Sequence, residues 1–503
     1  MVPVFTNNSC SPWADRESPC EIGAYVQYAV NVSTTEHVTK TINFVHRKNV
    51  RLVIRNTGHE YDIMYKNAGI ALAYCFPSYL GKSSGPFSLA LWMHHLTSVS
   101  VLSWSDDTYH GPAINLSAGV QGGDLLAFAA QHNLTALTGT CPSVGVAGGY
   151  IQGGGHSALS SKYGLAADQL LDMVIVDAQG DVKTINRKSD MDLFWALSGG
   201  GGGTFAVVLS VTIRAYPDLP SATVTMEFGA GKHARESYQE SIRSYLASLP
   251  GIHDAGCTTT NTFTRHGSQL SLMCHGKSSN ETSELLSPLQ TTLNRLHIPS
   301  SHTLVDLAKW SDGARKGWVG AEQYIVNHIQ AATWLIPQLN VLDPIRNTET
   351  VKAMMRVQDL GAIVGTQSFS PSRAKAAAAD NAVFPGWREA ALMVWVILPT
   401  NDSLPMARLL EDQQRLSKEL LPIIQAVAPD AGTYLNEADP VDENWKRNYY
   451  GSNYERLLAI KKRYDPEGIF YARHSVGSDA WVERHDGRLC RVEKDWPPFI
   501  DEL

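Results

Sequence analysis

CPSVGVAGGYIQGGGH (residues 141–156) and SGGGGGTFAVV (residues 198–208) together hold eleven of the 40 glycines of this 503-residue chain. Such runs cost backbone entropy on folding and therefore need a reason. The functional reason is close approach of backbone N–H groups to phosphate oxygens; the alternative is a flexible loop or tight packing of bare backbone. Neither run fits G-x-G-x-x-G, and the chain has no G-x-x-x-x-G-K-[ST], so a Rossmann dinucleotide site and a P-loop are both disfavoured.

A third feature of the same kind stands upstream, where RLVIRNT (51–57) reads as a buried strand that ends in a Gly-His turn. An arginine, backbone N–H groups and a glycine at a strand end suit a pyrophosphate, and the next residue is a nucleophilic imidazole. The candidate residues are Arg55, Asn56, Thr57, Gly58 and His59. Taken alone, such a histidine is more often a plain loop or core residue.

Composition limits the class of protein. The net charge is −7 and no long basic run occurs, so we expect no nucleic-acid partner. No stretch approaches the roughly 18 to 20 apolar residues that cross a bilayer, so we expect no membrane partner either. His94-His95 lacks further ligands at metal spacing, and no metal site is predicted.

Glycosylation acceptors and cysteines indicate an oxidising compartment. Six Asn-x-Ser/Thr matches occur, at Asn7, Asn31, Asn115, Asn133, Asn280 and Asn401. Among seven cysteines, Cys10 with Cys20 and Cys257 with Cys274 are plausible disulfides, which leaves Cys75, Cys141 and Cys490. We expect a secreted glycoprotein whose signal peptide has been removed and replaced by Met1.

Hydrophobic periodicity divides the chain. Strand, helix and strand patterns over 25–32, 35–49 and 51–57 form an α/β unit, and 171–186 reads as a hairpin that turns at Gln179-Gly180. From about residue 221 the strands alternate as in an antiparallel sheet with one wet face. Helical patterns there cover 234–248, 281–296, 350–360 and 403–428, and ALMVWVILP (391–399) reads as a central strand.

Four separated motifs then carry a family resemblance. They are RLVIRNTGHEY (51–61), the stretch from GTCPSVG to DAQGDV (139–182), DLFWALSGGGGGTFAVVLSVTI (192–213) and NYYGSNYERLLAIKKRYDPEGIF (448–470). In this order they resemble the berberine-bridge-enzyme-like branch of the vanillyl-alcohol oxidase flavoprotein family, and the N-terminal block is most similar to secreted fungal members. The region 221–425 carries little motif signal.

The resemblance implies an α+β chain with a two-part FAD domain of the p-cresol-methylhydroxylase type. Residues 1–220 and 429–503 would form that domain, and 221–428 a central substrate domain with an antiparallel sheet. It also implies FAD attached twice, through His59 to the 8α-methyl group and through Cys141 to C6 of the ring. The alternative for Cys141 is a buried free thiol or a disulfide partner.

The resemblance assigns further cofactor contacts. Val144 matches a position thought to gate oxygen at the flavin, where the alternative is core packing. The pyrophosphate and ring edge would be lined by Gly145, Gly148, Gly149, Gly153 and Gly154, and the adenine side by Gly202 and Val207. Tyr449 and Asn453, in Y-Y-G-S-N-Y, match the segment that approaches the isoalloxazine; the alternative is that they are core and cap residues.

The chemistry expected of such a cofactor is hydride removal from a carbon that bears O–H or N–H. We predict a secreted oxidase that oxidises an alcohol, such as a sugar or secondary-metabolite hydroxyl, and reduces O2 to H2O2. Tyr449 is the first candidate for the base, with Tyr434 and Asp439 in reserve, and Trp395 is a candidate substrate contact. The alternatives are a flavin dehydrogenase, an enzyme that closes a ring by oxidation, and a non-catalytic secreted binding glycoprotein.

One segment departs from the family pattern. The family runs directly from G-H-x-Y to x-G-K-S-x-G, whereas here residues 62–79 intervene between GHEY (58–61) and LGKSSG (80–85). One explanation is a retained intron, because 18 codons make 54 nucleotides and keep the frame. The alternative is a real insertion that forms a lid or surface flap.

Overall fold

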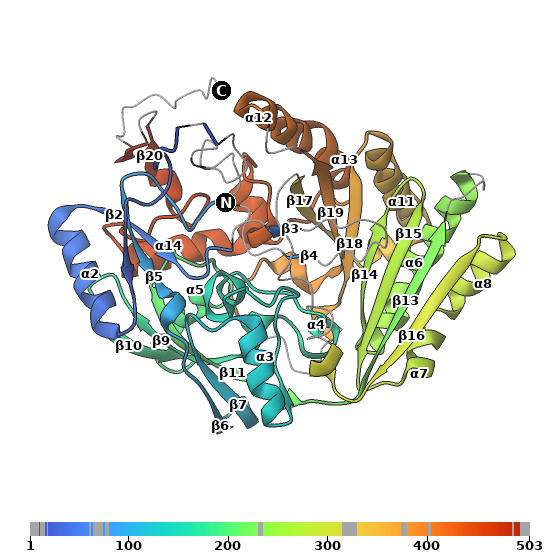
Figure 1. The fold of residues 1–503 in the computed structure, drawn as a ribbon, viewed down its shortest axis with the longest axis horizontal. Helices are drawn as coiled ribbons and strands as arrows, with labels where there is room; N and C mark the ends of the chain where they lie inside the picture. The colour runs from blue at the N-terminus through green and yellow to red at the C-terminus, as the bar shows by residue number, and fades with distance from the viewer. Residues whose placement is uncertain are drawn as a thin grey trace.

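The computed structural model describes residues 10, 16–17, 19–59, 62–63, 74–75, 80–229, 235–313, 329–373, 380–400, 404–484 and 487–492. Figure 1 shows two lobes. Elements from both ends of the chain form one lobe, and elements from its middle form the other. The predicted α+β class with a two-part first lobe is therefore confirmed.

The first sheet of the first lobe is parallel. It has the order β1 (Tyr28–Asn31), β5 (Ser88–Trp92), β2 (Arg51–Arg55). Helix α2 (Thr35–Lys48) connects β1 to β2 and buries its apolar stripe. It ends at Asn49, which has a left-handed backbone conformation. This is the α/β unit that the periodicity predicts.

A second, antiparallel sheet lies against the first. Its order is β10 (Val182–Asn186), β9 (Leu170–Val176), β11 (Val207–Arg214), β7 (His110–Ser117), β6 (Val99–Ser105). The predicted hairpin is confirmed, since β9 pairs with β10 around a turn in which Gly180 has φ of +86°. A parallel bridge between Leu52 and Phe470 joins the C-terminal segment to β2, so both ends of the chain build this lobe.

Helices and short strands complete the lobe. They are α3 (Gly122–Gln131), α4 (Ser160–Tyr163), α5 (Met191–Leu197), α14 (Tyr454–Tyr464), β8 (Leu134–Thr135), β12 (Tyr216–Pro217), β20 (Trp481–Glu483) and β21 (Leu489–Arg491). Residues Val146–Tyr150 (η2), Leu435–Glu437 (η8) and Lys446–Tyr450 (η9) form single irregular turns. These turns place the glycine-rich loop and the C-terminal segment near one another.

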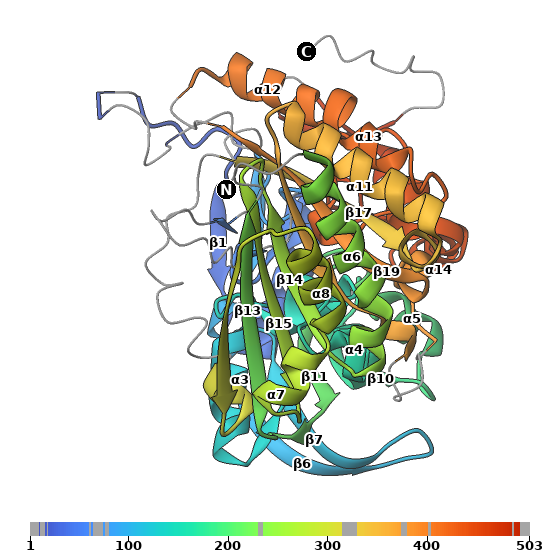
Figure 2. The same cartoon turned by 90° about the vertical axis from the view of Figure 1, so that its right-hand side faces the viewer.

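The second lobe is a seven-stranded antiparallel sheet. Its order is β16 (Ser300–Leu307), β13 (Ser221–Gly229), β15 (Gly267–His275), β14 (Thr258–Phe263), β18 (Ile363–Ser368), β19 (Ala390–Pro399), β17 (Ile329–Pro337). Helices cover one face of this sheet, as Figure 2 shows for α6 (Arg235–Asp254), α8 (Ser287–Arg295) and α11 (Pro344–Asp359). A large apolar core fills the space between sheet and helices. The other face looks toward the first lobe.

Two of the predicted helices are interrupted at proline. The helix predicted over 281–296 is split into α7 (Ser279–Glu284) and α8, in which Pro288 occupies the first turn. The helix predicted over 403–428 consists of α12 (Met406–Arg415), a π-helical turn and α13 (Leu421–Gln425), because Pro422 cannot donate a backbone hydrogen bond. The short helix α10 (Leu339–Leu342) was not predicted.

The other two predicted helices are longer than expected. Helix α6 continues to Asp254, and α11 begins at Pro344 rather than at residue 350. The early start of α11 has a local cause: the side chain of Asp343 accepts hydrogen bonds from the backbone N–H groups of Ile345 and Arg346. Apolar periodicity alone does not register such a cap.

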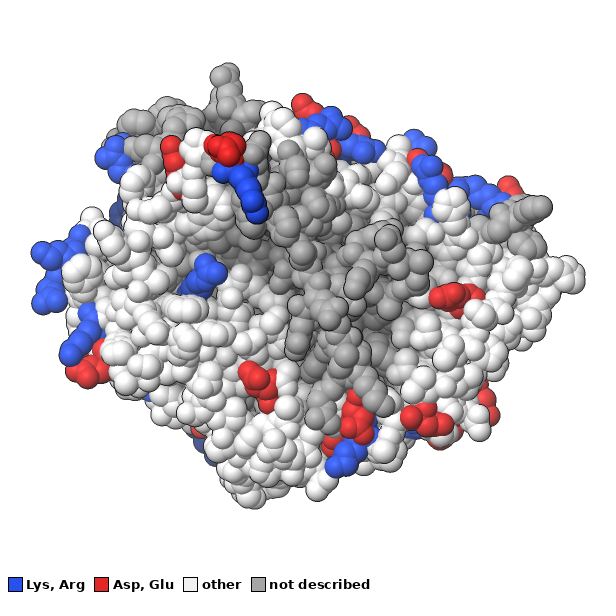
Figure 3. All heavy atoms as spheres, in the orientation of Figure 1, with Lys and Arg blue, Asp and Glu red and all other residues white. Residues whose placement is uncertain are grey.

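Two predicted disulfides are confirmed, Cys10–Cys20 and Cys257–Cys274, and Cys490 carries a free thiol. Asn31, Asn133 and Asn280 are exposed acceptors, whereas the amide of Asn115 donates to Thr212 within a sheet. Asn7 and Asn401 lie outside the described residues. No described helix is long and apolar enough to cross a membrane. On the face in Figure 3, described charged residues of both signs are scattered around the rim.

The departing segment 62–79 is described only in two short strands. Strand β3 (Asp62–Ile63) pairs antiparallel with β4 (Tyr74–Cys75). The remaining residues of the segment lie outside the described part of the chain. Both explanations, a retained intron and a real insertion, therefore stay predictions.

Candidate functional site

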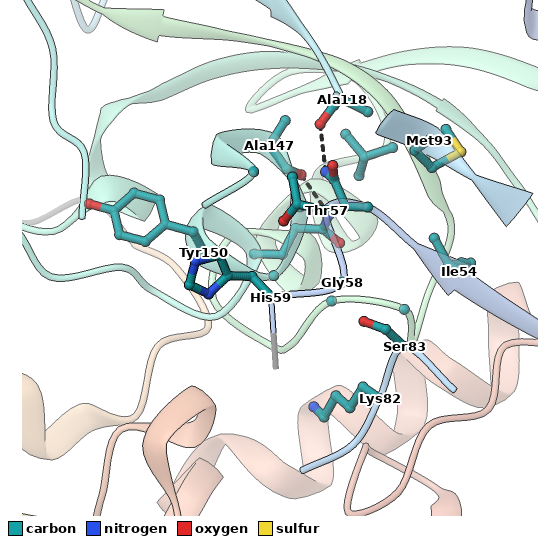
Figure 4. A pocket seen from close by; sticks show the side chains of 18 of the residues that line it. Ile54, Thr57, Gly58, His59, Lys82, Ser83, Met93, Ala118, Ala147 and Tyr150 are labelled. Atoms are coloured by element: carbon teal, nitrogen blue, oxygen red, sulfur yellow. Dashed lines mark hydrogen bonds between the residues drawn. The ribbon is translucent and has the colours of Figure 1, made fainter. Parts of the chain in front are cut away.

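A cavity of about 860 Å³ of empty space, partly open to solvent, lies between the two sheets of the first lobe (Figure 4). The strand-end turn and both glycine runs meet in its wall. Of the predicted cofactor contacts, the wall contains Asn56, Thr57, Gly58, His59, Val144, Gly145, Gly148, Gly149 and Gly202.

Glycine is required where the first run passes the side chain of Asn56. A Cβ atom added to Gly145 would lie 2.7 Å from Oδ1 of Asn56, and one added to Gly148 would lie 2.6 Å from its Nδ2. Asn56 in turn donates to the backbone carbonyl of Ala118 at 2.5 Å. Its Oδ1 atom is buried without a hydrogen-bond partner among the described residues. An acceptor of this kind beside a cavity indicates that a ligand donates to it.

The turn itself is shaped by Gly58, which has φ of +69°. Its missing Cβ leaves room for the guanidinium of Arg55, whose Nη2 would otherwise lie 2.4 Å away. Arg55 therefore packs behind the turn and is absent from the cavity wall. The prediction that it lines the cradle is corrected: it supports the turn from outside.

His59 lies in the cavity wall as a neutral imidazole. Desolvation of the ring lowers the pKa of His59 to about 4. Its Nε2 lies 2.9 Å from Oγ of Ser143, which is two residues after Cys141. The strand-end turn and the start of the first glycine run thus meet at the cavity, as the predicted double attachment requires.

Cys141 does not fit that attachment as the structure stands. It is 1% exposed, is not part of the described cavity wall and is engaged in a disulfide. A sulfur atom in a disulfide has no thiolate to bond to carbon. The alternative of a disulfide partner therefore holds for Cys141 in this structure.

The second glycine run touches the first. A Cβ atom on Gly202 would lie 3.2 Å from the Cα of Gly149, so bare backbone faces bare backbone. Gly153 and Gly154 lie behind the wall, next to Asn436 and Val383 respectively. They are positioned near the cavity rather than in its lining.

Two predicted contacts on this side are misplaced. In β11 the side chains alternate, so Ala206 and Val208 line the cavity while Val207 packs into another core. Asn453 donates its side-chain amide to the carbonyl of Val383 at 2.9 Å and is also absent from the wall. Its role is structural, as the alternative for it states.

The C-terminal segment contributes a different residue from the one predicted. Tyr449 is fully buried and its hydroxyl donates to the backbone carbonyl of Asp439, so it is not presented to the cavity. Burial also raises the pKa of Tyr449 well above its ordinary value. This geometry contradicts Tyr449 as the base, because Tyr449 is absent from the cavity wall and its hydroxyl already donates to Asp439.

The first reserve candidate, Tyr434, lies one hydrogen bond from the cavity wall. Asn436 lines the cavity and donates to the carbonyl of Gly149 at 2.8 Å and to the hydroxyl of Tyr434 at 2.7 Å. Burial and the charge of Glu437 raise the pKa of Tyr434, so its phenol is neutral. Asn436 was missed in the sequence analysis, although its position between Tyr434 and Asp439 in a polar loop was a usable signal.

The second reserve, Asp439, points elsewhere. Its Oδ1 accepts from Oγ of Ser417 at 2.8 Å and from Nε2 of Gln413 at 3.1 Å, both on the helical segment near the top of the second lobe. Burial raises the pKa of Asp439 to about 6. It does not line the cavity.

Sequence reasoning also missed a buried polar pair. Nε2 of His156 lies 2.9 Å from Oε1 of Glu437, and the indole N–H of Trp395 donates to Oε2 at 2.7 Å. His156 ends the first glycine run, Trp395 lies on β19 and Glu437 lies in the C-terminal segment. Only Trp395 was singled out beforehand, and as a substrate contact; here its indole holds a carboxylate.

The cavity suits a flavin dinucleotide. Lys82 and Ser83 supply a cation and a hydroxyl, while the buried Oε1 of Gln152 has no described hydrogen-bond partner. Bare glycine backbone permits close approach of phosphates, and the neutral imidazole of His59 lies in the same wall. No group of three or more possible metal ligands occurs among the described residues. Fold and site together fit the class of flavoproteins.

Comparison with known proteins identifies the family. A family model described as "FAD binding domain" matches residues 78–186, and one described as "Berberine and berberine like" matches 433–477. The FAD-linked oxidoreductase patO of Aspergillus clavatus is 37% identical over 98% of this chain and 83% of its own. The chain belongs to the berberine-bridge-enzyme-like branch of the vanillyl-alcohol oxidase flavoproteins, and it is an FAD-linked oxidoreductase.

Solved structures and further relatives agree. The VAO-type flavoprotein MtVAO615 from Myceliophthora thermophila has a TM-score of 0.90 at 34% identity, covering 97% of this chain and 86% of that one. The bifunctional decalin synthase calF of Penicillium decumbens is 35% identical over 98% of this chain and 83% of its own. A glucooligosaccharide oxidase from Acremonium strictum described with a 6-S-cysteinyl, 8α-N1-histidyl FAD shares the fold, at TM-score 0.70 and 20% identity, over 90% and 93% of the two chains.

Proposed function

We propose that this protein is a secreted oxidase that removes a hydride from an alcohol and passes the electrons to O2, giving H2O2. The observation that carries the proposal is the cavity wall, which contains neutral His59, Val144 and Asn436 together with bare glycine backbone. FAD bound there supplies a hydride acceptor. The chain itself holds the cofactor, excludes water and receives the proton that the alcohol loses.

His59 is the proposed attachment point of the flavin. A nucleophilic nitrogen must be unprotonated, and the lowered pKa of His59 keeps it so at neutral pH. A second attachment, at Cys141, would require its disulfide to open first, since one sulfur cannot hold both bonds. The singly and doubly attached forms therefore differ in whether peptide 141 carries flavin or a disulfide partner.

The proposed residue roles follow the cavity wall. The glycines 145, 148, 149 and 202, with Asn56, Thr57 and Gly58, hold the dinucleotide through backbone N–H groups and close contact. Val144, 5% exposed, is the proposed oxygen-side contact. Tyr434, through Asn436, is the proposed group at the substrate hydroxyl.

The attachment is tested by acid precipitation and peptide mass mapping. We expect flavin to stay with the precipitate in the native protein and to be released in His59→Ala. His132→Ala, at an exposed helix end, is the matched control and should keep its flavin. Flavin retained in His59→Ala on the peptide of Cys141 would indicate the doubly attached form. Peptide mapping of the native protein that finds no flavin on the peptide of residue 59 would exclude His59 as the tether.

The reaction is tested by a screen of alcohols for bleaching of the flavin. With a positive alcohol we expect H2O2 under air at a rate close to that with an artificial dye acceptor. A dye-only reaction would instead favour the dehydrogenase alternative. The ring-closing alternative is favoured by one observation, the similarity to a decalin synthase, and would show as a cyclised product in place of a carbonyl product.

A further inference from the structure

The hydrogen bond between His59 and Ser143 has no part in the proposal above. It joins Nε2 of His59 to Oγ of Ser143 at 2.9 Å, across 84 residues of sequence. His59 lies in the cavity wall (Figure 4), and so do Val144 and Gly145, which follow Ser143 directly. The bond therefore connects the proposed tether of the cofactor to the start of the first glycine run.

The backbone around Ser143 is held by the start of helix α3. The carbonyl of Pro142 accepts from the backbone N–H of Gly123 at 2.8 Å, and the carbonyl of Val144 accepts from that of Gly122 at 2.9 Å. A Cβ atom added to Gly123 would lie 3.0 Å from Cβ of Pro142, so this turn packs closely against the helix. Ser143 thus stands between two carbonyl groups that the helix fixes.

The turn that carries His59 is supported as well. Gly58 has φ of +69° and leaves room for the guanidinium of Arg55 behind the turn. The side chain of Asn56 donates to the backbone carbonyl of Ala118 at 2.5 Å. Imidazole and hydroxyl therefore both project from backbone that other contacts hold in place, as a site that orients a reacting group requires.

The protonation state of His59 determines what the bond can do. Burial lowers the pKa of His59 to about 4, so the ring is neutral at neutral pH and carries one N–H. A serine hydroxyl can accept from Nε2–H or donate to a bare Nε2. The first arrangement leaves a lone pair on Nδ1, and a ring nitrogen bonds to carbon only through its lone pair.

The hydroxyl of Ser143 is also a connection to solvent. Ser143 is exposed, whereas the ring of His59 is desolvated. A proton that leaves Nε2 can therefore pass through Oγ of Ser143 to water. Once Nδ1 is bonded to carbon, Nε2 holds a lone pair and the hydroxyl can donate to it. The same contact thus fits the free and the attached histidine, with its direction reversed.

We propose that Ser143 is the positioning residue that directs attachment of the cofactor to Nδ1 of His59, by holding the Nε2–H tautomer and taking up its proton. One N–C bond forms, and one C–H bond of the cofactor's methyl group breaks. The electron pair of that C–H bond passes to O2, the acceptor in the proposed function. With the two released protons, one from Nε2 and one from the methyl group, it gives H2O2. The inference deepens the proposed attachment at His59 and rests on it.

Other polar groups near the wall have partners of their own. The sulfur of Cys141 is engaged in a disulfide. The hydroxyl of Tyr150 donates to the backbone carbonyl of His156 at 2.9 Å. The side-chain amide of Asn436 donates to the hydroxyl of Tyr434 at 2.7 Å. Among these side chains and Ser143, the described hydrogen bond to His59 is made by Ser143.

The first test identifies the attached nitrogen and uses neither a variant nor an alcohol. The native holoprotein is digested, the peptide of residue 59 is isolated with its flavin, and proton NMR is recorded. A methylene group on Nδ1 lies near the Cβ protons of the histidine, whereas one on Nε2 lies near the ring proton on Cδ2. We expect attachment at Nδ1. Attachment at Nε2 would overturn the proposal, because Ser143 occupies that nitrogen.

The second test removes the hydroxyl. Full-length apoprotein from a riboflavin-starved host is mixed with FAD, and flavin on the peptide of residue 59 is measured over time. We expect attachment in Ser143→Ala to be slower by about 100-fold, the lower end of what a positioned proton acceptor contributes. Both ring nitrogens should then carry flavin in the product. Ser143→Thr keeps a hydroxyl and should restore the rate and the single attachment at Nδ1.

Ser105→Ala is the matched control. Oγ of Ser105, at the exposed end of β6, lies 2.8 Å from Nδ1 of His110, and neither residue lines the cavity. This variant should attach flavin at the native rate. An unchanged rate with attachment at Nδ1 alone in Ser143→Ala, or an equal loss in Ser105→Ala, would overturn the proposal. Absence of flavin from the peptide of residue 59 in the native protein would overturn the proposed attachment too, whereas the alcohol screen tests the oxidase reaction separately.

Discussion

At the scale of single residues, the site depends on glycines, because the absence of a Cβ atom leaves space for neighbouring side chains. Gly58 leaves space for Arg55, and Gly145 and Gly148 leave space for Asn56. The glycine runs could be predicted because their entropic cost needs a reason. The side on which Arg55 lies could not, because only the packed turn fixes it.

Gly148→Ala tests this dependence. Its Cβ would lie 2.6 Å from Nδ2 of Asn56, which is held by Ala118, so we expect a loss of about 1–3 kcal/mol of folding free energy. Gly149→Ala is the adjacent control, since no atom lies within 4 Å of its Cβ, and its stability should change by less than about 0.5 kcal/mol. Urea unfolding of both variants measures the difference. Equal losses would show that the contact with Asn56 is not the cause.

Asp439 gives a pH-dependent prediction. Burial raises the pKa of Asp439 to about 6 in the folded state, above the ordinary value of 3.8. The folded state therefore binds the proton more tightly than the unfolded state, and the contribution of this group to stability falls as pH rises from about 4 to about 6. Asp439→Asn should flatten the stability profile in this window. Thermal unfolding at several pH values measures it, and an unchanged slope contradicts the assignment.

At the scale of helices and strands, the sequence predicts an element correctly where the pattern of buried residues sets its bounds. It misplaces an element where a local contact sets them. The hairpin 171–186 and the antiparallel strands after residue 221 follow from alternation. Helix α11 begins earlier than its apolar pattern because of the cap at Asp343. Neighbouring side chains of β11 point to opposite faces of the sheet, so Val207 points away from the cavity. The predicted contact is therefore wrong by one residue.

Asp343→Ala tests the cap of α11. The carboxylate accepts from the N–H groups of Ile345 and Arg346, both at 2.9 Å, and these donors would lose their partner. We expect a loss of about 0.5–2 kcal/mol, with most of it restored in Asp343→Asn, because the amide oxygen can still accept. Denaturant unfolding provides the measurement. A loss in Asp343→Asn as large as in Asp343→Ala would point to charge rather than capping.

At the scale of the whole molecule, the family motifs of the two chain ends predict one lobe built from both of them, and the bridge between Leu52 and Phe470 bears this out. The contacts between lobes could not be predicted, because they join residues with no shared motif. One is the hydrogen bond that the indole N–H of Trp395, in the second lobe, donates to Glu437, in the first. Another joins Asp168, in the first lobe, to Arg388, in the second. Such contacts arise only once the lobes are packed.

The contact of Asp168 with Arg388 is bidentate, with distances of 2.8 Å and 2.7 Å, and the carboxylate is 1% exposed. Among the described residues, Arg388→Ala would leave that buried carboxylate with Asn381 and the backbone N–H of Leu165 as donors. Because one partner of a buried pair is removed, we expect the free energy of unfolding to fall by about 3 kcal/mol. We also expect the two lobes to unfold less cooperatively with each other. Arg408→Ala breaks an exposed pair with Glu411 and should cost less than about 1 kcal/mol. Calorimetry measures both variants. Separate unfolding transitions for the two lobes in Arg388→Ala, but not in Arg408→Ala, would assign the coupling of the lobes to this contact. A single transition at the native temperature in Arg388→Ala would mean that the aromatic contacts around His156 are enough to couple the lobes.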